Sequence, residues 1–250
     1  MTVAGLSRDQ WRILEKYRFT VHDGEDGTDV ASLLDPAELD LYISCRLHMI
    51  GTEDRMAAAS IFMKRYAFTA AMALMAMTCW NRKMDVNPEN MILVDHMKSG
   101  LWLPHVHVKN AGMEAFHSKE EKRAYIQNLF HKTIVPIIQA VSSTFNVPEM
   151  ILWENVAVYI YWVYETDDFF IGEGNESDRE EDFRMILSEE NVHWFGTCRK
   201  NPLNRFFKEK SPVGGEMIRV RKTCCFSYRL DGATGKCITC PLHDRTRKES

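Results

Sequence analysis

The chain has 250 residues, of which 45% are hydrophobic and 26% are charged, and its formal net charge is −4. This composition is typical of a globular protein and excludes disordered, fibrous and coiled-coil classes. The length is enough for one sizeable core, either as a single domain or as a domain with a small added module.

No segment of the sequence has the pattern of a signal peptide or of a membrane-spanning helix. Residues 1–11 lack the apolar stretch of a signal peptide. The longest weakly polar run, residues 66–80, is shorter than the about 20 residues that a spanning helix needs. We therefore expect a buried helix there and a cytoplasmic protein without a transmembrane segment, with transient membrane association left open.

The first half of the chain is predicted to be helical. Asp35 followed by Pro36 is typical of a helix start, and Gly51 is typical of a helix end. Thr52 is a candidate N-cap for a long helix that continues to about Trp80. The apolar run of residues 66–80 would then lie in the core.

The pattern next changes to that of extended strands. Residues 91–94 and 101–108 are predicted strands, and turn-forming residues 98–100 lie between them, so a β-hairpin is expected. His105 and His107 would share one face of the second strand. Together with His96 they would line a pocket or bind a metal, although a surface or hydrogen-bonded role is the preferred interpretation.

Helices are predicted again beyond the hairpin. Ser118 with Glu121 fits a capping box, and Pro136 is expected to kink the helix that follows. Pro148 suits the first turn of the next helix. The second half of the chain is therefore also mainly helical.

Basic residues gather near the end of the chain. Residues 199–250 contain 13 Lys and Arg against 5 Asp and Glu, a net charge of +8, which leaves −12 for the rest. A shift of this kind often marks a functional module. We therefore divide the chain into a mainly helical body, residues 1–198, and a basic C-terminal segment, residues 199–250, which are expected to form one compact unit.

Four of the seven cysteines lie in this basic segment, close to one another. They are the adjacent pair Cys224 and Cys225 and a Cys-x-x-Cys motif formed by Cys237 and Cys240. An odd number of cysteines without an export signal argues against a disulfide framework. Four free thiols at this spacing would oxidise one another, so a metal or iron-sulfur site is the better interpretation.

Zinc and a [2Fe-2S] cluster are the two alternatives for the four thiols. Structural zinc sites usually pair two Cys-x-x-Cys knuckles, whereas this chain has one knuckle and one adjacent pair. Neighbouring side chains of an extended chain point apart, so an adjacent pair suits two iron atoms better than one tetrahedral ion. The spacing favours the cluster. The zinc alternative would make the chain a non-enzymatic interaction module with a basic C-terminal tail.

Basic residues flank the cysteine motif. They are Arg219, Arg221, Lys222, Arg229 and Lys236. Nearby cations favour the reduced, more negative state of a cluster and raise its potential. The first three are also candidates for binding an anionic substrate. The two arginines are preferred over Lys222, because a guanidinium offers a planar fork to the paired oxygens of an anion.

The cysteine segment resembles a known family. Residues 221–230, RKTCCFSYRL, followed by Cys237-x-x-Cys240-Pro241, resemble the C-terminal signature of the FhuF-like ferric-siderophore reductases. In that family roughly ten residues separate the two cysteine pairs, and the spacing here is one residue longer, in a glycine-containing loop where insertions are tolerated. Residues 60–66 and 201–203 resemble segments of the same family more weakly.

The resemblance implies a cofactor, a reaction and partners. The four cysteines would hold a catalytic [2Fe-2S] cluster that reduces a ferric hydroxamate or citrate-hydroxamate siderophore by one electron and releases ferrous iron in the cytoplasm. The electron would come from a ferredoxin-type protein or a flavin reductase, because the chain has no G-x-G-x-x-G fingerprint and no P-loop. No nucleic-acid partner is expected. The implied fold is α+β, a predominantly helical siderophore-binding body with a small antiparallel sheet and a C-terminal [2Fe-2S] segment.

Overall fold

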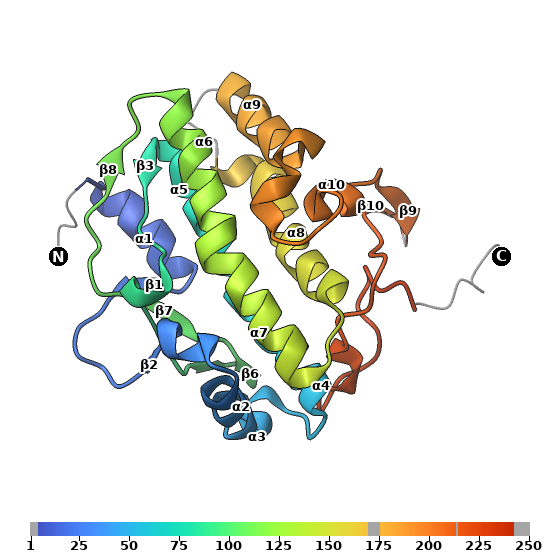
Figure 1. The fold of residues 1–250 in the computed structure, drawn as a ribbon. Helices are drawn as coiled ribbons and strands as arrows, with labels where there is room; N and C mark the ends of the chain where they lie inside the picture. The colour runs from blue at the N-terminus through green and yellow to red at the C-terminus, as the bar shows by residue number, and fades with distance from the viewer. Residues whose placement is uncertain (1–4, 170–175, 214, 243–250) are drawn as a thin grey trace.

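A computed structural model describes residues 5–169, 176–213 and 215–242 of the chain (Figure 1). Helix α5 (Phe68–Trp80) lies at its centre, and every residue after the first is buried. This segment is apolar around its whole circumference, which is the pattern of a helix enclosed on all sides. Helix α8 (Glu149–Glu165) packs against α5, and α4 (Arg55–Tyr66) packs against both α8 and α7 (Val135–Phe145).

The helix predicted to run from Thr52 to about Trp80 is in fact two helices. The break lies at Ala67, between α4 and α5. The N-cap of α4 is Asp54, whose carboxylate accepts hydrogen bonds from the backbone N–H groups of the second and third helical residues. The prediction of Thr52 as the cap was wrong, because its hydroxyl accepts instead from the backbone N–H of Asp54, 3.1 Å away.

The other predicted helix signals agree with the structure in part. The capping box is half formed, because Glu121 accepts from the backbone N–H of His117 and not from that of Ser118. Pro148 is the N-cap of α8 and not its first helical residue. Asp35 caps α2 directly before Pro36, and Gly51 ends α3 with a left-handed φ of 83°. Ser118 caps α6, and a π-helical segment precedes the expected kink at Pro136. The remaining helices are α1 (Arg8–Lys16), α2 (Pro36–Ser44), α3 (Leu47–Ile50), α6 (Lys119–Asn128), the π segment η3 (Leu129–Ile134), α9 (Glu176–Leu187), α10 (Pro202–Phe206) and the 3-10 helices η1 (Val30–Leu34), η2 (Pro88–Asn90), η4 (Asp167–Phe169), η5 (Glu189–Phe195) and η6 (Ser227–Arg229).

A four-stranded sheet in the order β1-β7-β4-β2 packs beside these helices. Its strands are β1 (Phe19–Val21), β2 (Thr28–Asp29), β4 (Met91–Val94) and β7 (His105–Val108). The predicted pairing of β4 with β7 is confirmed and is antiparallel. However, β1 pairs parallel with β7, so the sheet is mixed and not purely antiparallel.

The predicted hairpin is more finely divided than the sequence pattern indicates. Its tip is the small pair β5 (Met97–Lys98) and β6 (Leu101–Trp102), and Pro104, which has no N–H to donate, separates β6 from β7. Ser99 and Gly100 both have positive φ, as a tight hairpin turn requires. Two further pairs are β3 (Arg82–Lys83) with β8 (Glu114–Ala115) and β9 (Ser211–Val213) with β10 (Glu216–Ile218).

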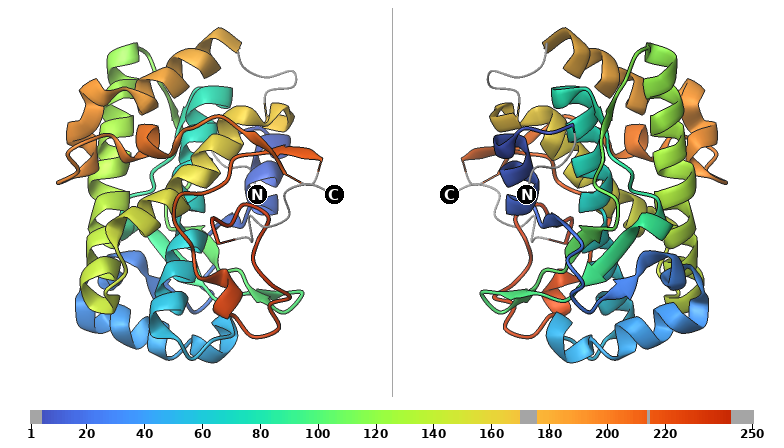
Figure 2. Two further views of the ribbon diagram at one scale, coloured as in Figure 1. Left: turned by 90° about the vertical axis from the view of Figure 1, so that its right-hand side faces the viewer. Right: turned by 90° about the vertical axis from the view of Figure 1, so that its left-hand side faces the viewer.

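The C-terminal segment lies against the helical body. Figure 2 shows it as an orange-to-red chain that runs over one side of the helices with little regular structure of its own. It is bonded to α8 through Glu154, to α4 through Ser60 and to the end of α3 through Gly51. Among the described helices, none combines the length and the apolar character needed to cross a membrane.

Candidate iron-sulfur site

The structure brings the four predicted cysteines together in two pairs. The thiols of Cys225 and Cys237 are in hydrogen-bond contact, and so are those of Cys224 and Cys240. Cys225 and Cys240 are buried, whereas Cys224 and Cys237 are half-buried. Each pair thus joins one member of the adjacent Cys-Cys to one member of the Cys-x-x-Cys.

This arrangement fits a cluster better than a single metal ion. A tetrahedral zinc with bonds of about 2.3 Å would hold all four sulfurs within about 4 Å of one another. Among the described residues, no three cysteines have their sulfur atoms all within 4.8 Å of one another. Two thiol pairs with a wider separation between them suit the two iron atoms of a [2Fe-2S] rhomb.

A buried carboxylate holds the backbone that leads into the adjacent cysteine pair. Glu154, on α8, is 2% exposed. It accepts hydrogen bonds from the backbone N–H groups of Lys222 and Thr223, both at 2.7 Å, and from the Thr223 hydroxyl. The Arg221 guanidinium lies 3.6 Å away and is itself buried. One carboxylate therefore fixes three successive residues before Cys224.

A second buried chain of hydrogen bonds ties the same segment to two helices. The Arg221 guanidinium donates to the Asn155 side-chain oxygen at 2.7 Å, and the Asn155 amide donates to the Ser60 carbonyl and hydroxyl. The Ser60 hydroxyl donates in turn to the carbonyl of Cys225 at 3.1 Å. Because every member is buried, the chain positions the Cys225 backbone rigidly between α4 and α8.

Sequence reasoning missed Glu154 and Asn155 as site residues. The available signal was a charged and an amide side chain side by side in the otherwise apolar run of residues 150–164. Such residues are rarely buried without partners.

Polar groups also contact the sulfur atoms. The backbone N–H of Phe226 donates to Cys224 Sγ at 3.4 Å, and the Ser227 hydroxyl lies 3.3 Å from Cys225 Sγ. Phe226 has a left-handed φ of 62°, so the chain turns sharply after the cysteine pair. Hydrogen bonds to ligand sulfurs are one of the factors that set the potential of an iron-sulfur cluster.

The charge around the site favours one thiolate in particular. A hydrogen bond from Cys237 lowers the pKa of Cys225 to about 4, and the cations of Lys64 and Arg221 act in the same direction against the effect of burial. The same hydrogen bond raises the pKa of Cys237, and burial raises that of Cys224. Since the thiolate is the ligand form of cysteine, the cations near Cys225 favour the form of this residue that a metal or cluster requires.

The loop between the two cysteine pairs is exposed and is anchored at its start. Residues 231–236 are all exposed. Arg229 pairs with Asp54 at the start of α4, at 2.5 Å, and the Asp231 N–H donates to the Gly51 carbonyl at 2.6 Å. Ile238, within the Cys-x-x-Cys, is 50% exposed. The cluster site therefore lies close to the molecular surface.

The three candidate substrate residues have different surroundings. Arg219 pairs with Glu165 through two hydrogen bonds of 2.9 and 2.6 Å, and Arg221 is buried beside Glu154. Lys222 is exposed, although its ammonium donates to a backbone carbonyl. Contact of these residues with a chelate stays a prediction. The partners of the two arginines favour Lys222 for that role, which reverses the order expected from guanidinium chemistry alone.

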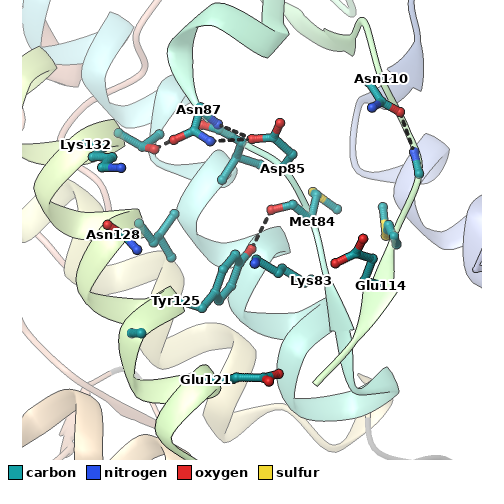
Figure 3. Close-up of a pocket in the computed structure, with 16 residues that line it drawn as sticks. Lys83, Met84, Asp85, Asn87, Asn110, Glu114, Glu121, Tyr125, Asn128 and Lys132 are labelled. Atoms are coloured by element: carbon teal, nitrogen blue, oxygen red, sulfur yellow. Dashed lines mark hydrogen bonds between the residues drawn. The ribbon is translucent and has the colours of Figure 1, made fainter. Parts of the chain in front are cut away.

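Two cavities differ in their relation to the cysteines. The larger, about 630 Å³, lies between the helical segment of residues 121–133 and the strands β3 and β8, and Figure 3 shows Tyr125 and Lys132 on its helical side. No residue of the C-terminal segment lines it. The smaller, about 250 Å³, is lined by Arg221, Glu154 and Thr239, the last of which lies inside the Cys-x-x-Cys. Only the smaller of these two cavities adjoins the cluster site.

Comparison with known proteins agrees with this geometry. The family described as "Ferric iron reductase FhuF-like transporter" matches residues 60–213, and the "FhuF 2Fe-2S C-terminal domain" matches residues 221–242. A ferric siderophore reductase of Escherichia coli (strain K12) is 26% identical over 172 residues. That alignment covers 68% of this chain and 59% of the relative, so the chain spans less than two thirds of the relative's length.

The second of these matches includes all four clustered cysteines. The predicted cofactor, a [2Fe-2S] cluster, is thereby confirmed, and the zinc alternative is set aside. The first match covers more than half of the chain. The protein belongs to the FhuF-like ferric iron reductase family and carries that family's C-terminal 2Fe-2S domain.

Proposed function

We propose that this protein reduces ferric iron in a hydroxamate or citrate-hydroxamate siderophore by one electron and releases ferrous iron in the cytoplasm. The observation that carries the proposal is the convergence of four thiols beneath an exposed loop, in a member of this family. The name of the E. coli relative supports the same substrate class.

The proposed chemistry makes few demands on the protein. When bound, the [2Fe-2S] cluster supplies a single electron. Ferric iron is a hard cation that oxygen donors hold tightly, whereas ferrous iron has a lower charge density and leaves the same donors readily. No general base or covalent nucleophile is required. The residues of this chain need only hold the cluster near the surface, shield the ligand sulfurs and guide the chelate to them.

We propose that the chelate docks on the open surface beside the Cys-x-x-Cys. The cavity next to Thr239, about 250 Å³, is below the about 300–1,000 Å³ of most ligand pockets. The exposed side chains of Lys222, Lys236 and Ile238 offer cations and an apolar contact at this surface. An anionic siderophore would be drawn to these cations.

The electron donor is proposed to be an acidic protein of the ferredoxin type or a flavin reductase. The net charge of +8 on residues 199–250 supports this, because charge complementarity raises association rates by about 10 to 1000-fold at low salt. Individual exposed ion pairs contribute only about 0 to 1 kcal/mol. Recognition should therefore depend on the summed charge and not on one lysine or arginine.

The experiment is a single-turnover reduction under argon. Chemically reduced protein is mixed with a ferric trihydroxamate or a ferric citrate-hydroxamate, together with a chromophoric trap for ferrous iron. We expect cluster reoxidation, seen in the visible spectrum, with one ferrous ion trapped for each cluster oxidised. A cluster that stays reduced with every chelate would reject the proposed activity.

Variants locate the docking surface in the same assay. Lys222→Gln is expected to slow the reaction and to make it less sensitive to salt. Lys200→Gln, which removes an equivalent exposed charge farther along the chain from the motif, serves as the matched control. Equal rates for both variants and the wild type would place the chelate elsewhere.

A further inference from the structure

A loop covers the outer face of the four-stranded sheet. Strands β1 and β2 form opposite edges of this sheet, and residues 22–27, which join them, lie against β7 and β4. Val106 and Val108 of β7 belong to the main core, which places His105 and His107 on the other face. Ile92, the partner of His107 in β4, lies on that outer face as well.

Gly27 brings the loop directly onto this face. A Cβ at Gly27 would lie 2.4 Å from Cγ2 of Ile92 and 3.0 Å from Cγ2 of Val94. The backbone therefore sits on the sheet where a side chain has no room. As a result His107 is only 3% exposed, although it points away from the main core.

The loop presents two carboxylates to the buried imidazole. A ring nitrogen of His107 and one oxygen each of Asp23 and Glu25 all lie within 4.8 Å of one another. The distance from His107 Nε2 to Glu25 Oε2 is 3.9 Å. This is too long for a hydrogen bond, but it leaves room for an ion, since two metal–ligand bonds of about 2.1 Å span up to about 4.2 Å.

The His107 imidazole lacks hydrogen-bond partners in its surroundings. Nδ1 of His107 is buried and has no hydrogen-bond partner. The neighbouring ring of His22, 6.1 Å away between centroids, also has a buried Nδ1 without a partner. Buried polar groups are nearly always hydrogen-bonded. Nε2, the other nitrogen of the His107 ring, is the one that faces Glu25, and at 3.9 Å it makes no hydrogen bond to that carboxylate. A metal ion between Nε2 and the two carboxylates would supply the missing contact on this side of the ring.

We propose that Asp23, Glu25 and His107 form a binding site for a divalent transition-metal ion, separate from the cysteine cluster. One imidazole nitrogen and two carboxylate oxygens are donors that suit Mn²⁺, Fe²⁺ or Zn²⁺. The exposed sides of Asp23 and Glu25 leave coordination positions for water. The ion would neutralise the two carboxylates and hold the loop on the sheet.

The test uses the full-length protein with its oxidised cluster, under argon, and Mn²⁺ as the probe. Free Mn²⁺ has a sharp six-line electron paramagnetic resonance signal that is lost on binding, and an oxidised [2Fe-2S] centre gives no signal that would interfere. The wild type is expected to remove one Mn²⁺ per chain from solution, and Zn²⁺ should displace it. Cluster absorbance verifies that each variant is folded.

His107→Gln and Glu25→Gln should each weaken Mn²⁺ binding at least about tenfold. Asp26→Asn removes the same charge from the same loop, but Asp26 is not one of the three ligands, so its affinity should stay within about twofold of the wild type. Glu25 is exposed, so its substitution tests the site without disturbing the core. The proposal is overturned if the wild type binds no Mn²⁺, or if Glu25→Gln binds it as Asp26→Asn does.

Discussion

Replacing Glu154 by glutamine should loosen the cluster site from the helical body. The substitution keeps the size of the side chain but removes the charge that accepts from Lys222 N–H, Thr223 N–H and the Thr223 hydroxyl. It also leaves the guanidinium of Arg221, whose side chain is 3% exposed, without its acidic partner. The backbone before Cys224 would then lose its main attachment to α8.

The expected loss of stability follows from burial. Removing one partner of a buried ion pair typically costs about 3–5 kcal/mol, because the other charge stays buried and unpaired. A domain is stable by only about 5–15 kcal/mol in total. We therefore expect Glu154→Gln to lower the free energy of unfolding by about 3–5 kcal/mol and to reduce the iron and sulfide retained per chain.

Urea unfolding followed by circular dichroism measures the first effect, and iron and sulfide analysis after desalting measures the second. Glu165→Gln is the matched control. Its side chain, 22% exposed, pairs with the more accessible Arg219, so a loss of about 1 kcal/mol is expected. The double variant Glu154→Gln, Arg221→Gln removes both buried charges and should be less destabilised than the sum of the two single variants.

Two results would refute this reasoning. One is a Glu154→Gln variant that loses less than about 1 kcal/mol, since that is the range of an exposed pair. The other is a double variant whose loss of stability equals the sum of the losses of the two single variants. Additive losses would show that Glu154 and Arg221 do not interact.

Three further predictions concern the cluster ligands, the loop over the sheet and the C-terminal segment. Serine at any of the four motif cysteines should abolish iron and sulfide binding, whereas Cys79→Ser and Cys198→Ser should keep both; the opposite pattern would reject the ligand assignment. Gly27→Ala should lower the urea midpoint by the equivalent of about 1–3 kcal/mol, because its Cβ meets Ile92. The loss should be larger than for Gly112→Ala, whose Cβ would meet only the side-chain oxygen of Asn110, at 3.3 Å; equal midpoints would contradict the packing. A chain that ends at residue 213 should be colourless but keep most of its helical circular dichroism. Its thermal midpoint should be lower, because Glu154 and Asn155 lose their partners. Complete unfolding would show that the cluster segment and the body fold as one unit.

The [2Fe-2S] cofactor, the four candidate ligands and the helical character of the body were accessible from the sequence, and the ligand assignment stays a prediction. The Cys-Cys and Cys-x-x-Cys spacing is a local property of the chain, and metal-site chemistry restricts what such a spacing serves. Long apolar segments such as residues 66–80 indicate buried helices for the same local reason. The caps at Asp35 and Ser118 are likewise set by neighbouring backbone groups.

Helix boundaries were harder to predict from the sequence where two capping signals compete. Thr52 and Asp54 are both good N-cap residues, and the choice of Asp54 depends on how α4 enters the core. No proline or glycine lies near Ala67 to indicate the break in the sequence. The break lies where the contacts on α8 change, since α4 contacts Asn155 and α5 contacts Tyr159 and Tyr164, which is a tertiary constraint.

The surroundings of the cluster were decided by tertiary structure alone. Glu154 and Asn155 become site residues only because packing brings α8 against a segment about seventy positions later in the chain. The same packing directs Arg221 to a buried carboxylate and leaves Lys222 exposed. The His107 site also depends on a loop that crosses the sheet to close over it. Local spacing identifies the candidate ligand atoms, whereas only long-range packing decides which charges and polar groups surround them, because burial is a property of the whole fold.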